Sequence, residues 1–473
     1  MRQLRLLALL APVLLLPVAC ENSSSSPSAP FTFEAGPGFE AGPSPEAGPL
    51  EDAGIDAADV FVPPAPTGVT VTVVQGLAPQ ADVRVISQDA TGAVIGDQKT
   101  DATGKLLITT VPNMVTVLAT RSGAPTPVTF YAVAEGDNLV VRIEQPLPEP
   151  STVSSYSVTF TPPAVAPIPN ANVVVNGSCY GNTTDTASPV LIGLYANCAL
   201  AANAILAEGS NIAGVRLGFA FKKSVPAPAA NATDNVLLGA WTAPGQTTLI
   251  ASNRPAGTLS LSSDLYMIAN GAAFMATGGG ALDDGGVNYA TATGFSDAYQ
   301  SFVRADGNFA NANVETAFIR REAVPAAATL ADFDFAAALP YITGAAIDTT
   351  TTARPSITLT SGSLAAADGG AVAISWSTAA ETLGTWTFVL PASAAATFKV
   401  PALPADATTF IPSTAPSIDS VVFFEATQIP GYKETKSLPI TPTVTLDLQN
   451  GALPLPTNGT VRFTTWSPAP PTR

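Results

Sequence analysis

Short runs of alternating apolar and polar residues, separated by turn residues, constrain the fold of this chain more than any other sequence feature. Residues 70–74 and 82–85 alternate as half-buried strands do, because strand side chains point to opposite faces of a sheet. Asp-Ala-Thr-Gly occurs at Asp89 and again at Asp101, with aspartate first and glycine fourth, as type I turns favour. Only 12% of the residues are charged. The pattern predicts a mainly β protein of tandem β-sandwich domains.

The N-terminus has the layout of a secretory signal peptide over residues 1–19. Arg2 and Arg5 precede an apolar stretch that is too short for a comfortable transmembrane helix, which needs about 20 residues. Leu-Pro-Val-Ala-Cys at residues 16–20 resembles the lipobox of bacterial lipoproteins, although Pro17 stands where that family prefers leucine. The resemblance implies that Cys20 carries a diacylglycerol and becomes the new N-terminus. The alternative is ordinary signal cleavage beside an incidental cysteine.

Residues 20–66 have the composition of a disordered tether. Glu-Ala-Gly-Pro recurs at Glu34, Glu40 and Glu46, and residues 21–60 hold eight acidic residues and no lysine or arginine. A segment with few large apolar groups and one sign of charge cannot offset the entropy lost on folding. After a lipidated cysteine, such a tether would hold a folded body away from the bilayer.

The rest of the chain is long enough for several domains, and we expect three units at residues 67–148, 149–324 and 325–473. The formal net charge of the whole chain is −16. That charge disfavours nucleic acid and anionic lipid headgroups as partners, because both attract basic surfaces.

The first unit, residues 67–148, resembles the carboxypeptidase regulatory-like domains, which are small transthyretin-like sandwiches. The resemblance rests on residues 81–85, on Thr-Asp-Ala-Thr-Gly-Lys-Leu at 100–106, and on the Val-Pro that follows. Leu106 stands where the family has an aromatic residue, and residues 113–115 replace its usual Pro-Gly-x-Tyr segment. The resemblance implies an accessory module without catalytic residues.

The second unit contains Cys179 and Cys198, and a periplasmic or extracellular setting predicts a disulfide between them. A metal site with two cysteines is the alternative, and it would need carboxylates because the chain has no histidine. Strand-like runs are spread through this unit and the third, whereas the alanine-rich residues 199–207 could form a short helix.

The absence of histidine excludes Ser-His-Asp and Cys-His nucleophile systems and the histidine-based zinc and iron sites. No phosphate-binding glycine loop or nucleophile elbow occurs either, so we assign no catalytic residue, metal or cofactor. The two Asp-Ala-Thr-Gly copies are better explained as turns than as protease motifs. Asp283 and Asp284 fit a plain loop better than a calcium site, because one acidic turn supplies too few oxygens. Asp332 and Asp334 fit a solvated edge better than a glycosidase pair.

Four tryptophans are the remaining candidates for ligand contacts. Trp376 and Trp386 lie in strand-like runs and should belong to the core, whereas Trp241 and Trp466 are better candidates for surface stacking on a sugar. We therefore expect a non-catalytic cell-envelope lipoprotein with a surface-binding, adhesion or structural role. The alternatives are a carboxylate-based polysaccharide hydrolase and an accessory subunit of an envelope complex. The partners would be the membrane through the lipid anchor and a polysaccharide or envelope protein. Glu21 after the cysteine favours the outer membrane or cell surface over the inner membrane.

Overall fold

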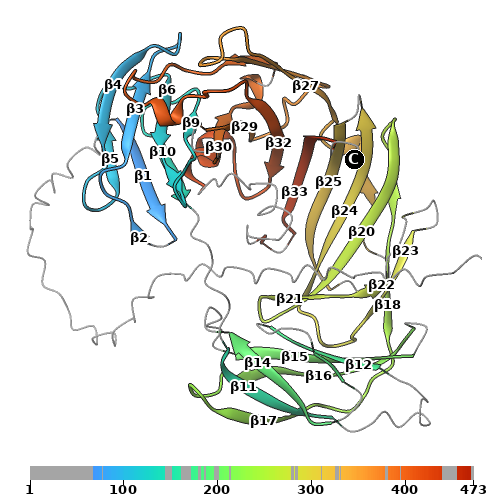
Figure 1. Ribbon diagram of the computed structural model, residues 1–473. Coiled ribbons are helices and arrows are strands. Elements are labelled where there is room, and N and C mark those ends of the chain that lie inside the picture. The colour runs from blue at the N-terminus through green and yellow to red at the C-terminus, as the bar shows by residue number, and fades with distance from the viewer. Residues whose placement is uncertain are drawn as a thin grey trace, which may run out of the picture.

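The computed structural model describes residues 68–76, 78–143, 152–160, 172–178, 183–185, 188–195, 202–211, 215–278, 282, 286–309, 312–324, 330, 332–378, 382–394, 396–438, 455–456 and 458–469. Over these residues the protein is mainly β, as the sequence predicted, with strands in several sheets (Figure 1). The described part includes one α-helix, α1 (Tyr432–Ser437). No helix among the described residues has the length and apolar character to cross a membrane.

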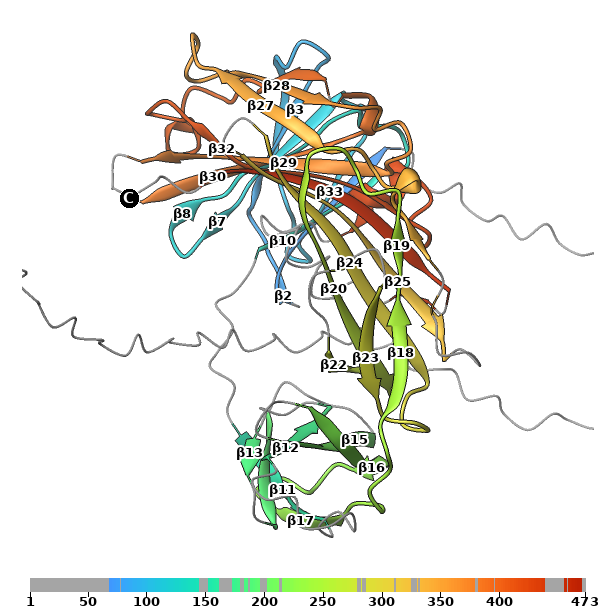
Figure 2. The same cartoon turned by 90° about the vertical axis from the view of Figure 1, so that its right-hand side faces the viewer.

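A sheet of twelve strands runs through the centre of the protein and curves from the N-terminal part to the middle of the chain (Figures 1 and 2). Every neighbouring pair in it is antiparallel except the parallel pair β30–β9. In spatial order the strands are β21 (Ala272–Met275), β20 (Thr258–Ala269), β24 (Ala298–Phe309), β25 (Ala312–Ala323), β33 (Thr460–Pro468), β32 (Ser417–Ala426), β29 (Gly369–Ser377), β30 (Leu383–Leu390), β9 (Val128–Phe130), β6 (Met114–Leu118), β3 (Arg84–Gln88) and β4 (Val94–Lys99).

Local sequence explains how the longest strands of this sheet are connected. β20, β24 and β25 have twelve residues each, and β20 turns directly into β21. Asn270 and Gly271 form that turn with φ values of 51° and 81°. A two-residue turn with both φ angles positive matches the twist of the flanking strands, and Asn-Gly is the dipeptide that tolerates it best.

The N-terminal strands form a sandwich with one end of the twelve-stranded sheet. The second layer of this sandwich contains β10 (Asn138–Ile143), β1 (Val69–Gln75), β5 (Lys105–Ile108) and β2 (Ala78–Pro79). Val69, Val71 and Val73 of β1 are fully buried against valines of β6 and against Phe130 of β9. The alternation of residues 70–74 therefore correctly predicted a strand with one face in the core. Val389 of β30 belongs to the same apolar cluster, so this core extends into the C-terminal part of the chain.

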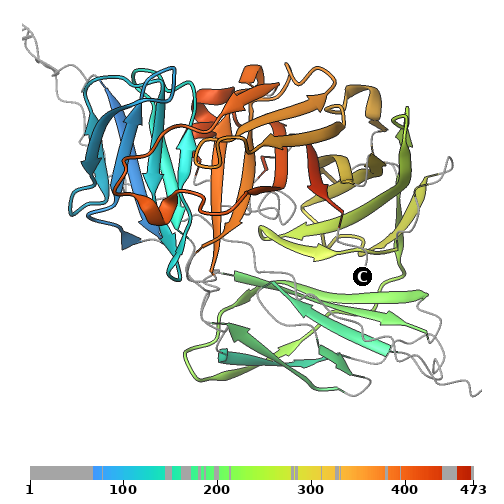
Figure 3. The same ribbon diagram turned by 45° about the horizontal axis from the view of Figure 1, so that its top comes forward.

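A second, smaller sandwich has its own core and lies below the main sheet in Figures 1 and 3. Tyr156, Val175 and Ile192 are among its fully buried residues. One layer contains β14 (Val190–Tyr195), β11 (Thr152–Thr159) and β17 (Thr233–Leu237), and the other contains β13 (Thr183–Asp185), β12 (Asn172–Gly177), β15 (Ala202–Ser210) and β16 (Arg216–Pro226).

The suggestion of a helix over residues 199–207 is wrong, because β15 covers Ala202–Ser210 as an extended strand. β15 pairs with β12 on one side and β16 on the other, and eight of its nine residues are buried. Two hydrogen-bonded neighbours and burial on both faces outweigh the modest helix propensity of alanine.

Small sheets and short elements cover the main sheet. Strands β27, β28 and β31 contribute Ile342, Ile357 and Phe398 to the largest apolar cluster, and β18 and β23 contribute Leu249 and Tyr289. These remaining elements are β18 (Gly245–Leu249), β23 (Val287–Thr291), β22 (Thr277–Gly278), β19 (Ala251–Ser252), β26 (Phe333–Asp334), β27 (Ile342–Asp348), β28 (Ser356–Ser361), β31 (Thr397–Lys399), β7 (Thr120–Arg121), β8 (Ala124–Pro125), η1 (Phe335–Ala337), η2 (Ala392–Ala394) and η3 (Thr408–Phe410).

The twelve-stranded sheet joins residues from all three units expected at 67–148, 149–324 and 325–473. β9 pairs with β30, which joins the first unit to the third, and β25 pairs with β33, which joins the second unit to the third. The small sandwich of residues 152–238 lies outside this ladder, as do strands β18, β19, β22 and β23 of the second unit.

Candidate functional site

Asp89 and Asp101 form two turns with the same geometry. In each, one carboxylate oxygen accepts from the backbone N–H and the hydroxyl of the threonine two positions later. It also accepts from the backbone N–H four positions later, at 2.9 Å and 3.0 Å. The glycines, Gly92 and Gly104, have positive φ values of 78° and 70°. These hydrogen bonds hold the pKa of both aspartates below its usual value. Both motifs are therefore turns, as the sequence predicted.

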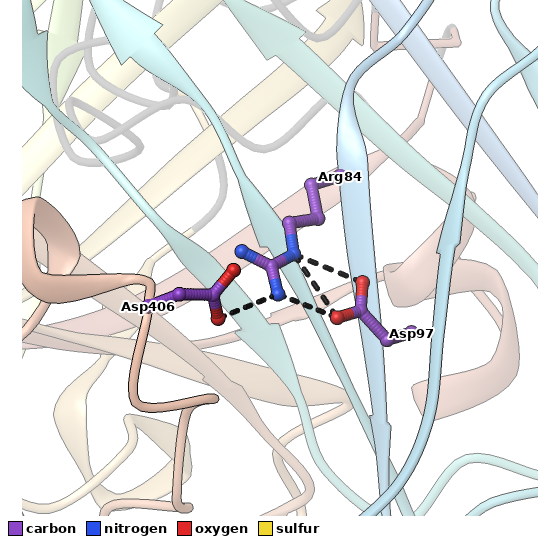
Figure 4. A network of polar contacts seen from close by, with 3 residues as sticks. All are labelled: Arg84, Asp97 and Asp406. Atoms are coloured by element: carbon purple, nitrogen blue, oxygen red, sulfur yellow. Dashed lines mark hydrogen bonds and ion pairs between the residues drawn. The ribbon is translucent and has the colours of Figure 1, made fainter.

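The most distinctive polar arrangement on the first sandwich is centred on Arg84 of β3 (Figure 4). Its Nε donates to Oδ1 of Asp97 on the neighbouring strand β4 at 2.9 Å, and its Nη2 donates to Oδ2 of Asp97 at 2.5 Å. The same Nη2 donates to Oδ1 of Asp406 at 2.9 Å. Asp406 lies 322 positions along the chain, in the loop before η3, so the arginine joins the first sandwich to a C-terminal loop.

Arg84 lines an open hollow of about 750 Å³ between the first sandwich and the segment around η3. Gln75 and Gln80 supply amide groups, and Thr120, Ser122 and Thr409 supply hydroxyl groups. An apolar wall is formed by Leu118, Ile143 and Phe410. The hollow therefore combines neutral hydrogen-bonding groups with apolar surface.

Charges are balanced among the described residues that line the hollow. The cations among them are Arg84 and Lys99, and the anions are Asp82 and Asp406. The hydrogen bonds from Arg84 hold the pKa of the Asp97 and Asp406 carboxyls below its usual value, so both stay ionised at neutral pH. The guanidinium is thus held in a fixed geometry by two carboxylates. This arrangement suits a neutral polar ligand better than a strongly charged one.

The aspartates considered for glycosidase chemistry have structural partners. Asp332 accepts a hydrogen bond from Ser252 at 2.6 Å, and Asp334 accepts one from Asn253 at 2.8 Å. Asp334 also caps η1 by accepting from the backbone N–H of Ala336. Asp332 and Asp334 are exposed, as expected for a solvated edge.

Two other carboxyls have raised pKa values but lie apart from the hollow. Burial raises the pKa of Asp264 on β20 and that of Asp419 on β32. Ser375 donates to Asp419 at 2.6 Å. Within the described residues, no group of three or more cysteine and acidic side chains is placed to hold a metal ion. Asp283 and Asp284 lie outside the described residues.

The tryptophans divide differently from the sequence-based expectation. Trp376 and Trp386 are buried in the core, as predicted. The expected surface position of Trp466 is wrong, because the ring is only 8% exposed and belongs to the main apolar cluster. Trp466 lies on β33, whose neighbours β25 and β32 enclose it.

Trp241 is half-buried and packs against the small sandwich. Its ring meets Phe160 edge to face, with the ring centroids 5.9 Å apart. It also covers Gly209 and Gly218, which lack side chains and so leave room for the indole. This packing leaves only part of the ring available for stacking on a sugar.

The three cysteines, Cys20, Cys179 and Cys198, lie outside the described residues. Lipidation of Cys20 and the disulfide between Cys179 and Cys198 stay predictions. The hollow around Arg84 was not predicted from the sequence. The alternation of residues 82–85 was the sequence signal that could have indicated an accessible arginine, because it places Arg84 on the opposite face of the strand from the buried Val85. No local pattern could indicate that Asp406 would meet it.

Comparisons with known proteins give no family. No family model matches the sequence, and no curated protein matches it. Among solved structures, the Bacillus anthracis TIE protein is similar over 57% of this chain and 50% of that chain, with 9% sequence identity and a TM-score of 0.14. The tetra-tandem repeat in the extending region of a large adhesion protein is similar over 76% of this chain and 95% of that chain, with 12% identity and a TM-score of 0.13. The chain thus spans half the length of the first of these proteins. Likenesses this slight carry no argument about function.

Proposed function

We propose that this protein is an exported lipoprotein that is anchored through Cys20 and binds a neutral polysaccharide at the cell surface without catalysis. The observation that carries the proposal is the open hollow around Arg84. Its balanced charge, amide and hydroxyl groups and apolar wall match the chemistry of a sugar. Sugars offer hydroxyl groups for hydrogen bonds and apolar C–H faces for packing, and they carry no charge that must be neutralised.

The rigidity of Arg84 supports a binding role. Asp97 and Asp406 fix the guanidinium, and the main sheet fixes the backbone of β3 on both sides through β4 and β6. A site that is already ordered loses little conformational entropy when a ligand binds. A carboxylate pair for acid–base hydrolysis would instead need one carboxyl kept protonated near neutral pH. The hydrogen bonds at Asp97 and Asp406 have the opposite effect, because they lower the pKa of both groups.

The anchoring part of the proposal rests on the sequence. The basic start, apolar stretch and Cys20 have the layout of a lipoprotein signal, and the acidic, Gly- and Pro-rich residues 20–66 have the composition of a tether. A tether of this kind would present the β-rich body to ligands away from the bilayer. We propose the outer membrane, with the body at the cell surface, as its location.

Location is tested by membrane fractionation and protease treatment of intact cells, comparing wild type with Cys20→Ala. We expect wild type in the outer-membrane fraction and accessible to protease, and the variant released from the membrane. A variant that fractionates like wild type would overturn the lipid anchor. A wild-type protein that is protected in intact cells would overturn the surface location.

Binding is tested with the full chain on a panel of neutral and anionic bacterial polysaccharides, comparing wild type with Gln80→Ala. Loss of one neutral hydrogen bond should weaken binding roughly three- to tenfold. Gln98→Ala is the matched control, because Gln98 is exposed on β4 and alternation puts it on the opposite face from Asp97 and Lys99. Equal affinity of both variants for every polysaccharide, or a preference for the anionic ones, would contradict the proposed site.

A further inference from the structure

Helix α1 places a lysine against an aspartate inside the protein. The side chains of Lys436 and Asp137 are only 3% and 2% exposed, and Lys436 Nζ donates to Asp137 Oδ2. Asp137 immediately precedes β10 in the first sandwich, and Lys436 lies 299 positions later in the chain. A charged pair with so little exposure loses nearly all its hydration, which makes it a costly way to hold two segments together.

The surroundings of the pair fix both reacting groups. Lys436 Nζ also donates to the backbone carbonyl of Ala132 at 3.1 Å and lies 4.7 Å from the centre of the Tyr432 ring. Asp137 Oδ2 accepts a further hydrogen bond from the backbone N–H of Ala134 at 2.7 Å. Val133, between Ala132 and Ala134, belongs to the apolar cluster of the first sandwich, and Leu438, two positions after Lys436, packs against that cluster.

The Lys436 ammonium group and the Asp137 carboxylate are in direct hydrogen-bond contact. A proton that moves from the ammonium group to the carboxylate converts two buried charges into an amine and a carboxylic acid. Those two groups are the reactants that form an amide. Fixed contact between them replaces a collision in solution, and well-oriented groups of this kind react as if at roughly 10⁵–10⁸ M.

We propose that Lys436 and Asp137 are joined by an intramolecular amide bond. The Nζ lone pair attacks Cγ of Asp137, the C–N bond forms, and the Cγ–Oδ2 bond breaks. Oδ2, which accepts the hydrogen bond from Lys436, leaves as water with the proton transferred from Lys436 and one released by the attacking nitrogen. No oxidant or reductant is needed, because one amine and one carboxylic acid give one amide and one water.

Backbone groups hold both reacting side chains in place. The N–H of Ala134 donates to Oδ2, the oxygen that leaves as water. The carbonyl of Ala132 holds one N–H of Lys436 to the side and so orients the nitrogen. Once the bond forms, burial keeps water away from it. The cross-link would join α1 covalently to the first sandwich, so that force or heat could not separate the two without breaking the amide bond.

Peptide mapping of the denatured full-length protein tests the proposal without relying on any variant. Trypsin does not cut after a lysine whose amine is in an amide bond. The expected product is therefore a branched peptide in which residues 122–142 are joined to residues 434–462, lighter by one water than the sum of the two. Separate peptides covering residues 122–142 and 434–436 in the wild-type digest would show an ordinary ion pair and overturn the proposal.

Variants provide matched controls for the chemistry. Asp137→Asn should give the same branched peptide as wild type, because an asparagine loses ammonia and leaves the identical amide. Lys436→Arg and Asp137→Ala should give only linear peptides. Lys433→Arg, on the exposed side of the same helix, should keep the branch. A branched peptide that persists in Asp137→Ala would assign the bond to another residue and also overturn the proposal.

Discussion

A buried chain of hydrogen bonds crosses the seam between the first sandwich and the C-terminal strands. Trp386 Nε1 on β30 donates to Thr129 Oγ1 on β9 at 2.8 Å, and Thr129 shares a hydrogen bond of 2.8 Å with Thr116 on β6. The side-chain amide oxygen of Gln88 on β3 accepts a hydrogen bond from the Thr116 hydroxyl. In this orientation the amide nitrogen of Gln88 donates to two backbone carbonyls, each at 3.2 Å. All four side chains are fully buried. Thr129 is the link, because it both accepts from Trp386 and contacts Thr116.

Thr129→Val should therefore lower the stability of this seam by about 1–3 kcal/mol. Valine has nearly the shape of threonine, so the change makes little cavity and leaves the Trp386 N–H buried without an acceptor. Urea unfolding followed by tryptophan fluorescence measures the effect. Thr360→Val, at an exposed position of β28, is the control, with an expected change within about 0.5 kcal/mol.

A double-mutant cycle isolates the contact between Trp386 and Thr129. In a Trp386→Phe background the donor is already gone, so Thr129→Val should cost about 1–2 kcal/mol less than it does in the wild-type background. Equal costs in both backgrounds would refute this reasoning. So would a Thr129→Val variant that unfolds at the same urea concentration as the Thr360→Val control.

The remaining predictions concern a glycine turn and two carboxylates. Gly104→Ala should lower the melting temperature more than Gly123→Ala. Both glycines have positive φ, but of the two only Gly104 would place a Cβ 2.6 Å from a backbone oxygen. Equal losses of melting temperature would contradict this. Burial raises the pKa of Asp419. The contribution of this group to the free energy of unfolding is therefore fully present below its pKa in the unfolded chain, and it is lost as pH rises through its pKa in the folded protein. Asp419→Asn should accordingly raise the melting temperature at about pH 7 and change it little at about pH 3, and an equal shift at both would refute it. The hydrogen bond from Arg84 lowers the pKa of Asp97. The contribution of Asp97 to the free energy of unfolding is therefore present above its pKa in the unfolded chain, and it is lost as pH falls through its pKa in the folded protein. Asp97→Asn should cost at most about 1 kcal/mol near neutral pH and nothing in strong acid, as urea titrations at the two pH values would show.

Local pattern was a reliable guide wherever one strand face is buried and the other exposed. The alternation at residues 70–74 predicted β1, and the two Asp-Ala-Thr-Gly motifs predicted turns whose aspartates accept backbone hydrogen bonds. Local pattern was misleading at residues 199–207, because the signals of a buried strand and of an alanine-rich helix overlap when nearly every residue is apolar or small.

The sequence by itself determined the β character of the protein, its main turns, and the absence of histidine chemistry. Those properties depend on side chains within a few positions of each other, or on composition. Only the tertiary structure decided which distant strands pair, that Arg84 meets Asp406, that Trp466 is buried, and that Lys436 lies against Asp137. Each of these contacts joins segments separated by tens to hundreds of residues or depends on neighbouring strands. They are set by the packing of whole sheets, for which a local pattern carries no signal.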